Sequence, residues 1–299
     1  MKNILTIILR LTVSCLIAGL IMGMTFVFTN KAKKANEHAR EEKVVYSLLG
    51  YSKANPIPDS MGLHEIFRYV VSDGETQSIG YLLPSEGHGE AEAFNFVRID
   101  LDGKYLDSSS VAITEKKVKD QKDRDVAVQI ALGAGKEIRF VDQTIVVTEG
   151  DGRLAYLLGG KFPGFKTHIA IMLALDPSYS ILGLEVMEHE EDPGLGAEIE
   201  QEYFKNQFKL KPFEKIKSIE VVKAPLPNEY FDALEGRVDE SAAFDIMKQY
   251  SDQDIYALTG ATISSAAVSS GVRAMTKKFA YRLDILDRVL NEQQIAVPF

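Results

Sequence analysis

Residues 259–279 read TGATISSAAVSSGVRAMTKKF. Small or apolar residues recur about every four positions from Ile263 to Phe279, which predicts a helix with one buried face. Thr259 is a residue type that accepts hydrogen bonds from the free N–H groups at a helix start, so we expect it to cap this helix. The same spacing continues through Leu283 and Leu290, so the last long helix is expected to extend almost to the end of the chain. A shorter helix is expected before it, over 240–249.

The Thr-Gly-Ala-Thr start of this stretch also has the chemistry of a phosphate site. Gly260 and Ala261 are small enough to let another group approach the backbone. Free N–H groups and the positive end of the helix dipole favour a phosphate beside the Thr262 hydroxyl, which can form a phosphoester. The alternative is that these four residues only begin a helix.

Composition limits the classes of function. The chain has 299 residues, 45% of them apolar, which suffices for one large or two small domains. A net charge of −9 argues against nucleic acid as a partner. The single cysteine, Cys15, excludes an internal disulfide and a Cys-ligated iron–sulfur cluster, and five scattered histidines argue against a metal site. A redox cofactor of this chain would therefore be organic.

An uncharged stretch of 19 residues, Leu11–Thr29, predicts a transmembrane helix after a short tail, 1–10. A cleaved signal peptide is the alternative, but the apolar run is long and no small-x-small cleavage site closes it. A charged, helical stalk is expected over 30–60. More Lys and Arg follow the span than precede it, which by the positive-inside rule favours a cytoplasmic domain.

Beyond the stalk the pattern predicts an α+β domain of antiparallel sheet with flanking helices. Two similar three-stranded units are expected within 61–135 and 136–290, followed by a tail, 291–299. Each unit has an Asp-Gly turn, a Tyr-Leu-Leu strand, a Gly-containing turn and two further strands. These features lie at Asp73-Gly74, Tyr81–Leu83, Gly87-His88-Gly89 and 105–113 in the first unit, and at Asp151-Gly152, Tyr156–Leu158, Pro163-Gly164-Phe165 and 181–187 in the second.

Only the second unit leads into an unusual loop, EHEEDPGLGAE, at Glu188–Glu198. Its Pro-Gly-x-Gly pattern forces a tight turn, and the glycines leave space for another group. The crowded carboxylates should repel one another and be solvated, and their spacing matches no EF-hand calcium loop. These carboxylates are Glu188, Glu190, Glu191 and Asp192.

Two segments resemble a known family. Residues 259–265, TGATISS, resemble the flavinylation motif of FMN-binding domains. Residues 189–196, HEEDPGLG, resemble the His-x-Glu-Thr-Pro-Gly-Leu-Gly segment of two proteins: the G subunit of Rnf-type electron transport complexes and the C subunit of sodium-pumping NADH:quinone oxidoreductases. Asp192 replaces the usual Thr. Both families also begin with one membrane helix and a stalk. The resemblance extends from about Ala155 to Phe279 and is looser before it.

The resemblance implies that Thr262 carries FMN through its phosphate, attached by a separate flavin transferase that uses FAD. It also implies a domain on the extracytoplasmic, periplasmic face of the cell membrane, against the charge rule. It implies no metal and no complete active site in this chain, because FMN carries the electrons. The other expected FMN-binding residues are Thr259, Gly260, Ala261, Ser265, Glu191, Pro193, Gly194, Leu195 and Gly196.

Of the two families, the sequence of the loop resembles the Rnf type more. That resemblance implies a component of an ion-translocating oxidoreductase, a translocase, that couples ferredoxin and NAD redox chemistry to ion transport. Its partners would be integral-membrane, flavin and iron–sulfur subunits. Three alternatives stay open: the C subunit of the sodium pump, a membrane-tethered binding or scaffold module without flavin, and a free-standing extracellular flavoprotein.

Overall fold

A computed structural model describes residues 2–52, 54–58, 60–85, 94–150 and 152–299, and the chain divides into two units, 1–47 and 48–299. The first unit is nearly all of one helix, α1 (Lys2–Leu48). Its segment Thr6–Asn30 is long and apolar enough to cross a membrane, which includes the predicted span and part of the predicted tail. The helix continues beyond Asn30 to Leu48 and so includes Asn30–Lys43, the part of the stalk that was expected to be helical.

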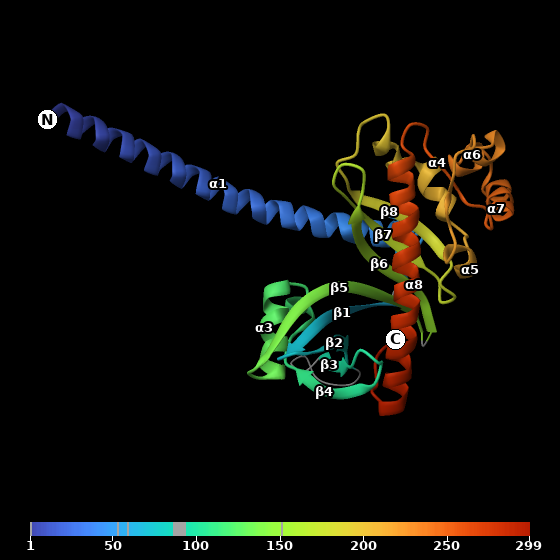
Figure 1. The fold of residues 1–299 in the computed structure, drawn as a ribbon, viewed down its shortest axis with the longest axis horizontal. Coiled ribbons are helices and arrows are strands. Elements are labelled where there is room, and N and C mark those ends of the chain that lie inside the picture. Colours follow the sequence, from blue (N-terminus) through green and yellow to red (C-terminus); the bar gives the residue numbers. More distant parts are fainter. Residues whose placement is uncertain (1, 53, 59, 86–93, 151) are drawn as a thin grey trace. The chain divides into compact units, whose positions relative to one another are not determined.

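The second unit is built on one antiparallel sheet of eight strands in the order β4-β3-β2-β1-β5-β6-β7-β8 (Figure 1). Long central strands β1 and β5 pair with each other, so the sheet is continuous. This confirms the predicted α+β class. The strands are β1 (Met61–Asp73), β2 (Thr76–Pro84), β3 (Phe94–Ile99), β4 (Tyr105–Val111), β5 (Lys136–Glu149), β6 (Gly152–Pro163), β7 (His168–Leu175) and β8 (Ile181–Glu188).

The strand order contains two meanders of four strands each, which we call the first meander (β1–β4) and the second meander (β5–β8). The sequence indicated three strands in each and missed the long strands that open them. Gly87-His88-Gly89 and Asp151, which were expected at turns, lie outside the described residues. That the meanders are degenerate copies of one repeat stays a prediction.

The two faces of the first meander are covered differently, because successive side chains of a strand point to opposite faces. Phe67 and Leu82 pack in a cluster with Val128 of α3 (Gln121–Leu132), which follows the short helix α2 (Glu115–Val118). Their neighbours Ile66 and Tyr81 belong to a larger cluster. Both faces of β1 and β2 therefore carry buried side chains, whereas alternate residues of β4 are exposed.

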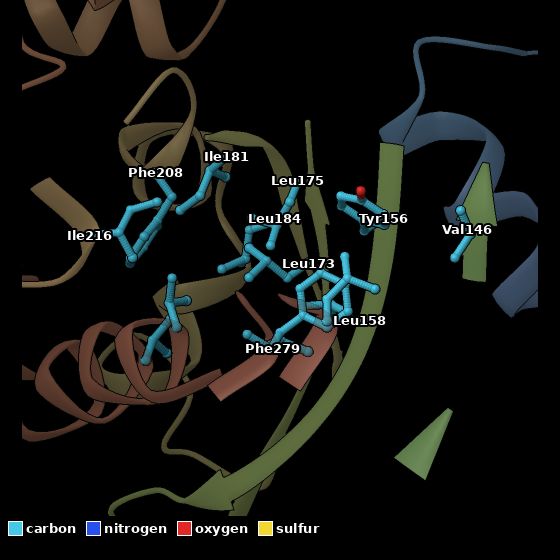
Figure 2. Packing of buried hydrophobic residues seen from close by; sticks show 14 of the residues in the cluster. Val146, Tyr156, Leu158, Leu173, Leu175, Ile181, Leu184, Phe208, Ile216 and Phe279 are labelled. Atoms are coloured by element: carbon cyan, nitrogen blue, oxygen red, sulfur yellow. The ribbon is translucent and has the colours of Figure 1, made fainter. Parts of the chain in front are cut away.

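The larger cluster lies between the sheet and the last helix, α8 (Thr262–Gln293). Figure 2 shows Leu173 and Tyr156 of the second meander packed near Phe279 of α8. Phe208 and Ile216, from the segment between the sheet and α8, fill the other end of this core. Burial of this apolar surface, worth about 25 cal/mol per Å², fixes α8 on the sheet.

The segment between β8 and α8 is a run of short elements that returns the chain to the sheet. Lys211 is buried and its ammonium donates to the carbonyls of Tyr250, Ser251 and Gln253, which anchors the approach to α8. The helix predicted over 240–249 is confirmed. The elements are η1 (Gly196–Glu200), α4 (Glu202–Lys205), η2 (Asn206–Phe208), α5 (Phe213–Ile216), β9 (Val221–Val222), α6 (Asn228–Leu234), α7 (Glu240–Gln249) and β10 (Ile255–Tyr256).

Candidate cofactor site

The long helix begins at Thr262, and Ala261 occupies the cap position. No side chain among the described residues caps its first N–H groups, so the prediction that Thr259 caps the helix is wrong. Gly260, with a φ of 75°, turns the chain between Thr259 and the helix. Thr259 therefore lies too early in the chain, exposed to solvent, to reach the amides that a cap residue serves. Those N–H groups remain available to an anion.

Around the helix start, buried and accessible groups alternate. The Thr262 residue is half-buried, whereas Ala261 and Ser265 are buried. The Ser265 hydroxyl accepts a hydrogen bond from the Leu258 amide (3.1 Å) and donates to the Ala261 carbonyl (3.0 Å). Ser265 thus fixes the turn that precedes the helix, while Thr262 keeps an accessible surface.

The Glu191 carboxylate is the buried centre of the site, which corrects the expectation that all four loop carboxylates are solvated. It accepts hydrogen bonds from the amides of Phe165 (2.8 Å) and Lys166 (3.2 Å) and from the Ser264 hydroxyl. A buried carboxylate is tolerated when hydrogen-bond donors replace its water. Among the other three, Glu188 and Glu190 are exposed, and Asp192 pairs with Lys166.

Two glycines make room for this carboxylate. A Cβ atom on Gly196 would lie 2.7 Å from both Glu191 Oε2 and Ser264 Oγ. A Cβ atom on Gly164 would lie 2.5 Å from Glu191 Oε1. The sequence had suggested that Gly196 leaves space for another group, and in the structure that group is the Glu191 side chain of the protein itself.

The Pro-Gly-Leu-Gly turn lies against the Thr-Gly-Ala-Thr segment. Gly194 takes a φ of 71° within the turn, and Leu195 Cδ2 would be 2.9 Å from a Cβ atom on Gly260. Together with the contact between Glu191 and Ser264, this places the two predicted motifs side by side. Pro193, Gly194 and Leu195 are exposed at the turn.

His189 stabilises the loop through both of its ring nitrogens. Its Nδ1 atom accepts a hydrogen bond from the Glu191 amide (3.0 Å), and its Nε2 atom lies 3.0 Å from Glu200 Oε1. One ring nitrogen therefore accepts while the other donates, which fixes the orientation of the imidazole. His189 links the start of the loop to η1 and does not itself reach the Thr262 segment through any contact that the structure describes.

Sequence reasoning missed three residues of the site: Gly164, Phe165 and Ser264. The first two were recognised only as a hairpin turn. The bond from the Phe165 amide to Glu191 and the close approach of Gly164 to the same carboxylate could be identified only once the fold was known. Phe165, Leu195 and Ile263, each of which is or adjoins a residue that contacts Glu191 or Gly260, have 57%, 45% and 59% of their surfaces accessible, and we call these three exposed side chains the apolar rim. Large apolar side chains that gather at a surface are typical of a binding site.

The arrangement suits a phosphate-bearing aromatic cofactor. It combines uncapped helix amides, a hydroxyl that can be esterified and an apolar rim, which match a phosphate and a planar ring respectively. The described part of the chain contains no group of three or more His, Cys, Asp or Glu residues that could hold a metal ion.

Comparison with known proteins agrees with this chemistry. Residues 164–277 match the model of the FMN-binding domain, a range that includes Gly164, Glu191 and Thr262. The G subunit of the proton-translocating ferredoxin:NAD(+) oxidoreductase complex of Clostridium ljungdahlii is 30% identical over 125 residues, which are 42% of this chain and 53% of the relative. The G subunit of the ion-translocating oxidoreductase complex of Pasteurella multocida is 34% identical over 61 residues, or 20% and 30%.

Two solved structures are also similar. NqrC of Shewanella oneidensis has 18% identity over 47% of this chain and 57% of its own, with a TM-score of 0.34. The C subunit of the Na(+)-translocating NADH-quinone reductase of Parabacteroides distasonis has 19% identity over 62% and 74%, also with a TM-score of 0.34. The chain spans about half the length of the Clostridium relative and 30% of the Pasteurella relative. Residues 164–277 are therefore similar to an FMN-binding domain, and part of the chain is similar to the G subunits of two ion-translocating oxidoreductase complexes.

Proposed function

We propose that the chain is an electron-transfer subunit of a membrane complex of the Rnf type and carries FMN through a phosphoester to Thr262. The observation that carries the proposal is the meeting of the two motifs: Leu195 lies against Gly260, and Glu191 bonds to Ser264. The match to the FMN-binding domain over 164–277 supports the choice of cofactor.

In this proposal, each group of the site has a role in binding or positioning FMN. The free amides at the start of α8 bind the FMN phosphate, and the half-buried Thr262 supplies the oxygen of the ester. Glu191 fixes the first turn of the helix through Ser264 and so holds Thr262 in place. FMN supplies the chemistry when it is bound, since a flavin can accept and release one or two electrons.

The apolar rim of Phe165, Leu195 and Ile263 would lie next to the flavin ring. About half of each of these residues is accessible, so a ring beside them would stay open to another protein. An electron carrier requires such access, because it passes electrons to a partner instead of transforming a bound substrate. No acid, base or nucleophile is assigned to catalysis in this chain.

The proposed location is the cell membrane, with Thr6–Asn30 as a single span and the FMN domain on the extracytoplasmic side. The proposed partners are the other membrane, flavin and iron–sulfur subunits of the complex and the flavin transferase that attaches FMN. Reporter fusions after Phe299, one active in the cytoplasm and one outside it, test the side. Activity of only the cytoplasmic reporter would contradict the extracytoplasmic assignment.

The experiment that tests the cofactor assignment is expression of the full chain together with a flavin transferase. Wild type should gain the mass of one FMN less one water and fluoresce in a denaturing gel. Thr262→Ala should lose both properties, whereas Ser270→Ala, which removes an exposed hydroxyl farther along the same helix, should keep them. Fluorescent Thr262→Ala protein would refute Thr262 as the attachment point. An unmodified wild type would favour a scaffold without flavin.

The assignment to a complex is tested separately by mild detergent extraction of the native membrane. Subunits that are integral to the membrane and carry flavin or iron–sulfur clusters should purify with this chain. A flavinylated chain that purifies alone under conditions in which membrane complexes stay intact would identify a free-standing flavoprotein.

A further inference from the structure

A small cavity lies on the sheet side of α8, well away from Thr262. Its volume is about 20 Å³, which is room for one water molecule or an ion of similar size. Strands β1, β2 and β5 and helix α8 all contribute to its wall. Its polar lining consists of Arg68, Tyr81, Asp142, Thr144 and Arg282, the rest of the lining is apolar, and one side is open to solvent.

Two arginines but only one carboxylate line the cavity. Arg68 forms a two-point ion pair with Asp142, with Nε 2.9 Å from Oδ1 and Nη2 bonded to Oδ2. Arg282 Nη1 lies 3.4 Å from the same Oδ2 atom. Two guanidinium groups thus share one carboxylate, which leaves one positive charge in excess at a partly buried site. Such a charge is costly unless a counter-charge accompanies it.

Tyr81 adds a second donor that lacks a partner. The residue is 7% exposed and lines the cavity, and its hydroxyl, which bonds to none of the described residues, keeps contact with solvent. Burial raises the pKa of this phenol, although Arg282 and Arg68 oppose the rise, so it remains an O–H donor at neutral pH. Burial also lowers the pKa of Arg282, with Asp142 opposing and Arg68 adding to the effect.

We propose that this cavity binds a small monovalent inorganic anion of about the size of chloride. The free donors at the cavity are the guanidinium N–H groups of Arg282 that do not face Asp142 and the Tyr81 hydroxyl. A cation would meet an excess of positive charge, while an anion neutralises that excess and accepts hydrogen bonds from both donors.

The anion would join α8 to the centre of the sheet. Arg282 is on α8, 20 residues after Thr262, which corresponds to about 30 Å along the helix axis. Arg68 and Tyr81 belong to β1 and β2 of the first meander. The site is therefore independent of the FMN proposal, and either can fail without the other.

The test is thermal unfolding of the detergent-solubilised full chain in sodium chloride and in sodium gluconate at equal ionic strength. Chloride should raise the Tm of wild type in a saturable manner, since binding to the folded state alone stabilises it, and gluconate should not. Bromide should replace chloride. Arg282→Gln and Tyr81→Phe should weaken chloride binding about ten- to a hundredfold, as expected for loss of a hydrogen bond to a charged group.

Arg237→Gln is the matched control, because Arg237 is an exposed arginine that pairs with Asp232 and Glu235 at the surface. It should keep the full response to chloride. Equal Tm values in chloride and gluconate would overturn the proposal and would mean that the cavity holds only water. An unchanged chloride response in Tyr81→Phe would also overturn it, and this variant decides the matter if Arg282→Gln does not fold.

Discussion

The two meanders share a topology but differ in the segment that comes after their last strand. In the first meander, β4 leads to α2 and α3, which cover one face of the sheet and bury Phe67 and Leu82. In the second, β8 leads to the Pro-Gly-Leu-Gly loop, which turns toward the start of α8. The meander itself is therefore scaffold, and the candidate site comes from the connection after it.

The buried polar groups of the two meanders differ in the same way. In the first, Arg124 lies over the ring of Phe67 and donates to Tyr69, so its charge is held inside a packed core. In the second, the buried Glu191 collects donors from two loops and from α8. The first arrangement stabilises one layer, whereas the second joins three segments at a surface.

The largest expected effect tests whether the meanders fold together. Leu82→Ala in the first and Leu173→Ala in the second should each lower the free energy of unfolding by about 2–5 kcal/mol, since both side chains are fully buried. Both should shift one cooperative transition in denaturant, followed by circular dichroism, because β1 and β5 form one sheet. The exposed Leu101→Ala should change little, and two separate transitions would show that the meanders unfold independently.

The second prediction concerns the contact between the loop after β8 and the start of α8. Ser264→Ala removes a hydrogen bond to the buried Glu191 carboxylate and should cost about 1.5–3 kcal/mol, together with a lower level of flavin attachment. Ser270→Ala, an exposed serine of the same helix, is the control and should behave as wild type. Normal stability and flavin loading in Ser264→Ala would mean that this hydrogen bond does not hold Thr262 in place.

One closely packed glycine belongs to each half of the sheet: Gly80 to the first meander and Gly196 to the loop after the second. Gly196→Ala places a methyl group against Glu191, and Gly80→Ala places one 2.1 Å from the ring of Phe96, so each should cost about 1–3 kcal/mol. Only Gly196→Ala should reduce flavin attachment in protein that has folded. Gly159→Ala, where nothing lies within 4 Å, should be neutral in both measurements. Reduced attachment in folded Gly80→Ala would mean that the first meander shapes the site.

The smallest effect is a pH dependence at the edge of the first meander. Arg98 holds the pKa of Asp107 below its usual value through their hydrogen bonds. The resulting stability is complete above the unfolded pKa, about 3.9, and is lost as the pH falls through the lower folded value. Asp107→Asn should therefore cost less than about 1 kcal/mol at pH 7, because the pair is partly exposed, and the difference from wild type should shrink in acid urea titrations.

Sequence periodicity was sufficient for regular elements with a clear apolar pattern. The helix over 240–249 and the long helix through Leu290 were predicted, and the two motif segments lie together as the resemblance implied. The opening strands β1 and β5 were missed. In β5, most residues from Lys136 onward are only partly buried, so no sharp alternation marks the strand.

The centre of the site could not be predicted for a different reason. Glu191 stands in a run of carboxylates, where solvation is the reasonable expectation, and its burial depends on amides at Phe165 and Lys166, 25 or more residues earlier. Thr259 was misjudged because a cap depends on where the helix starts, and Gly260 delays that start to Thr262. Both errors concern distant or backbone contacts that residue types do not encode locally.

The order in which these pieces emerge from the ribosome has a consequence for maturation. Residues 164–196 form one side of the candidate site, but the acceptor helix follows them in the chain and must dock on a completed sheet. If FMN is joined to Thr262 only in that docked form, attachment can occur only after both the sheet and α8 have been synthesised. The yellow colour of the chain would then mark molecules that have passed a folding check.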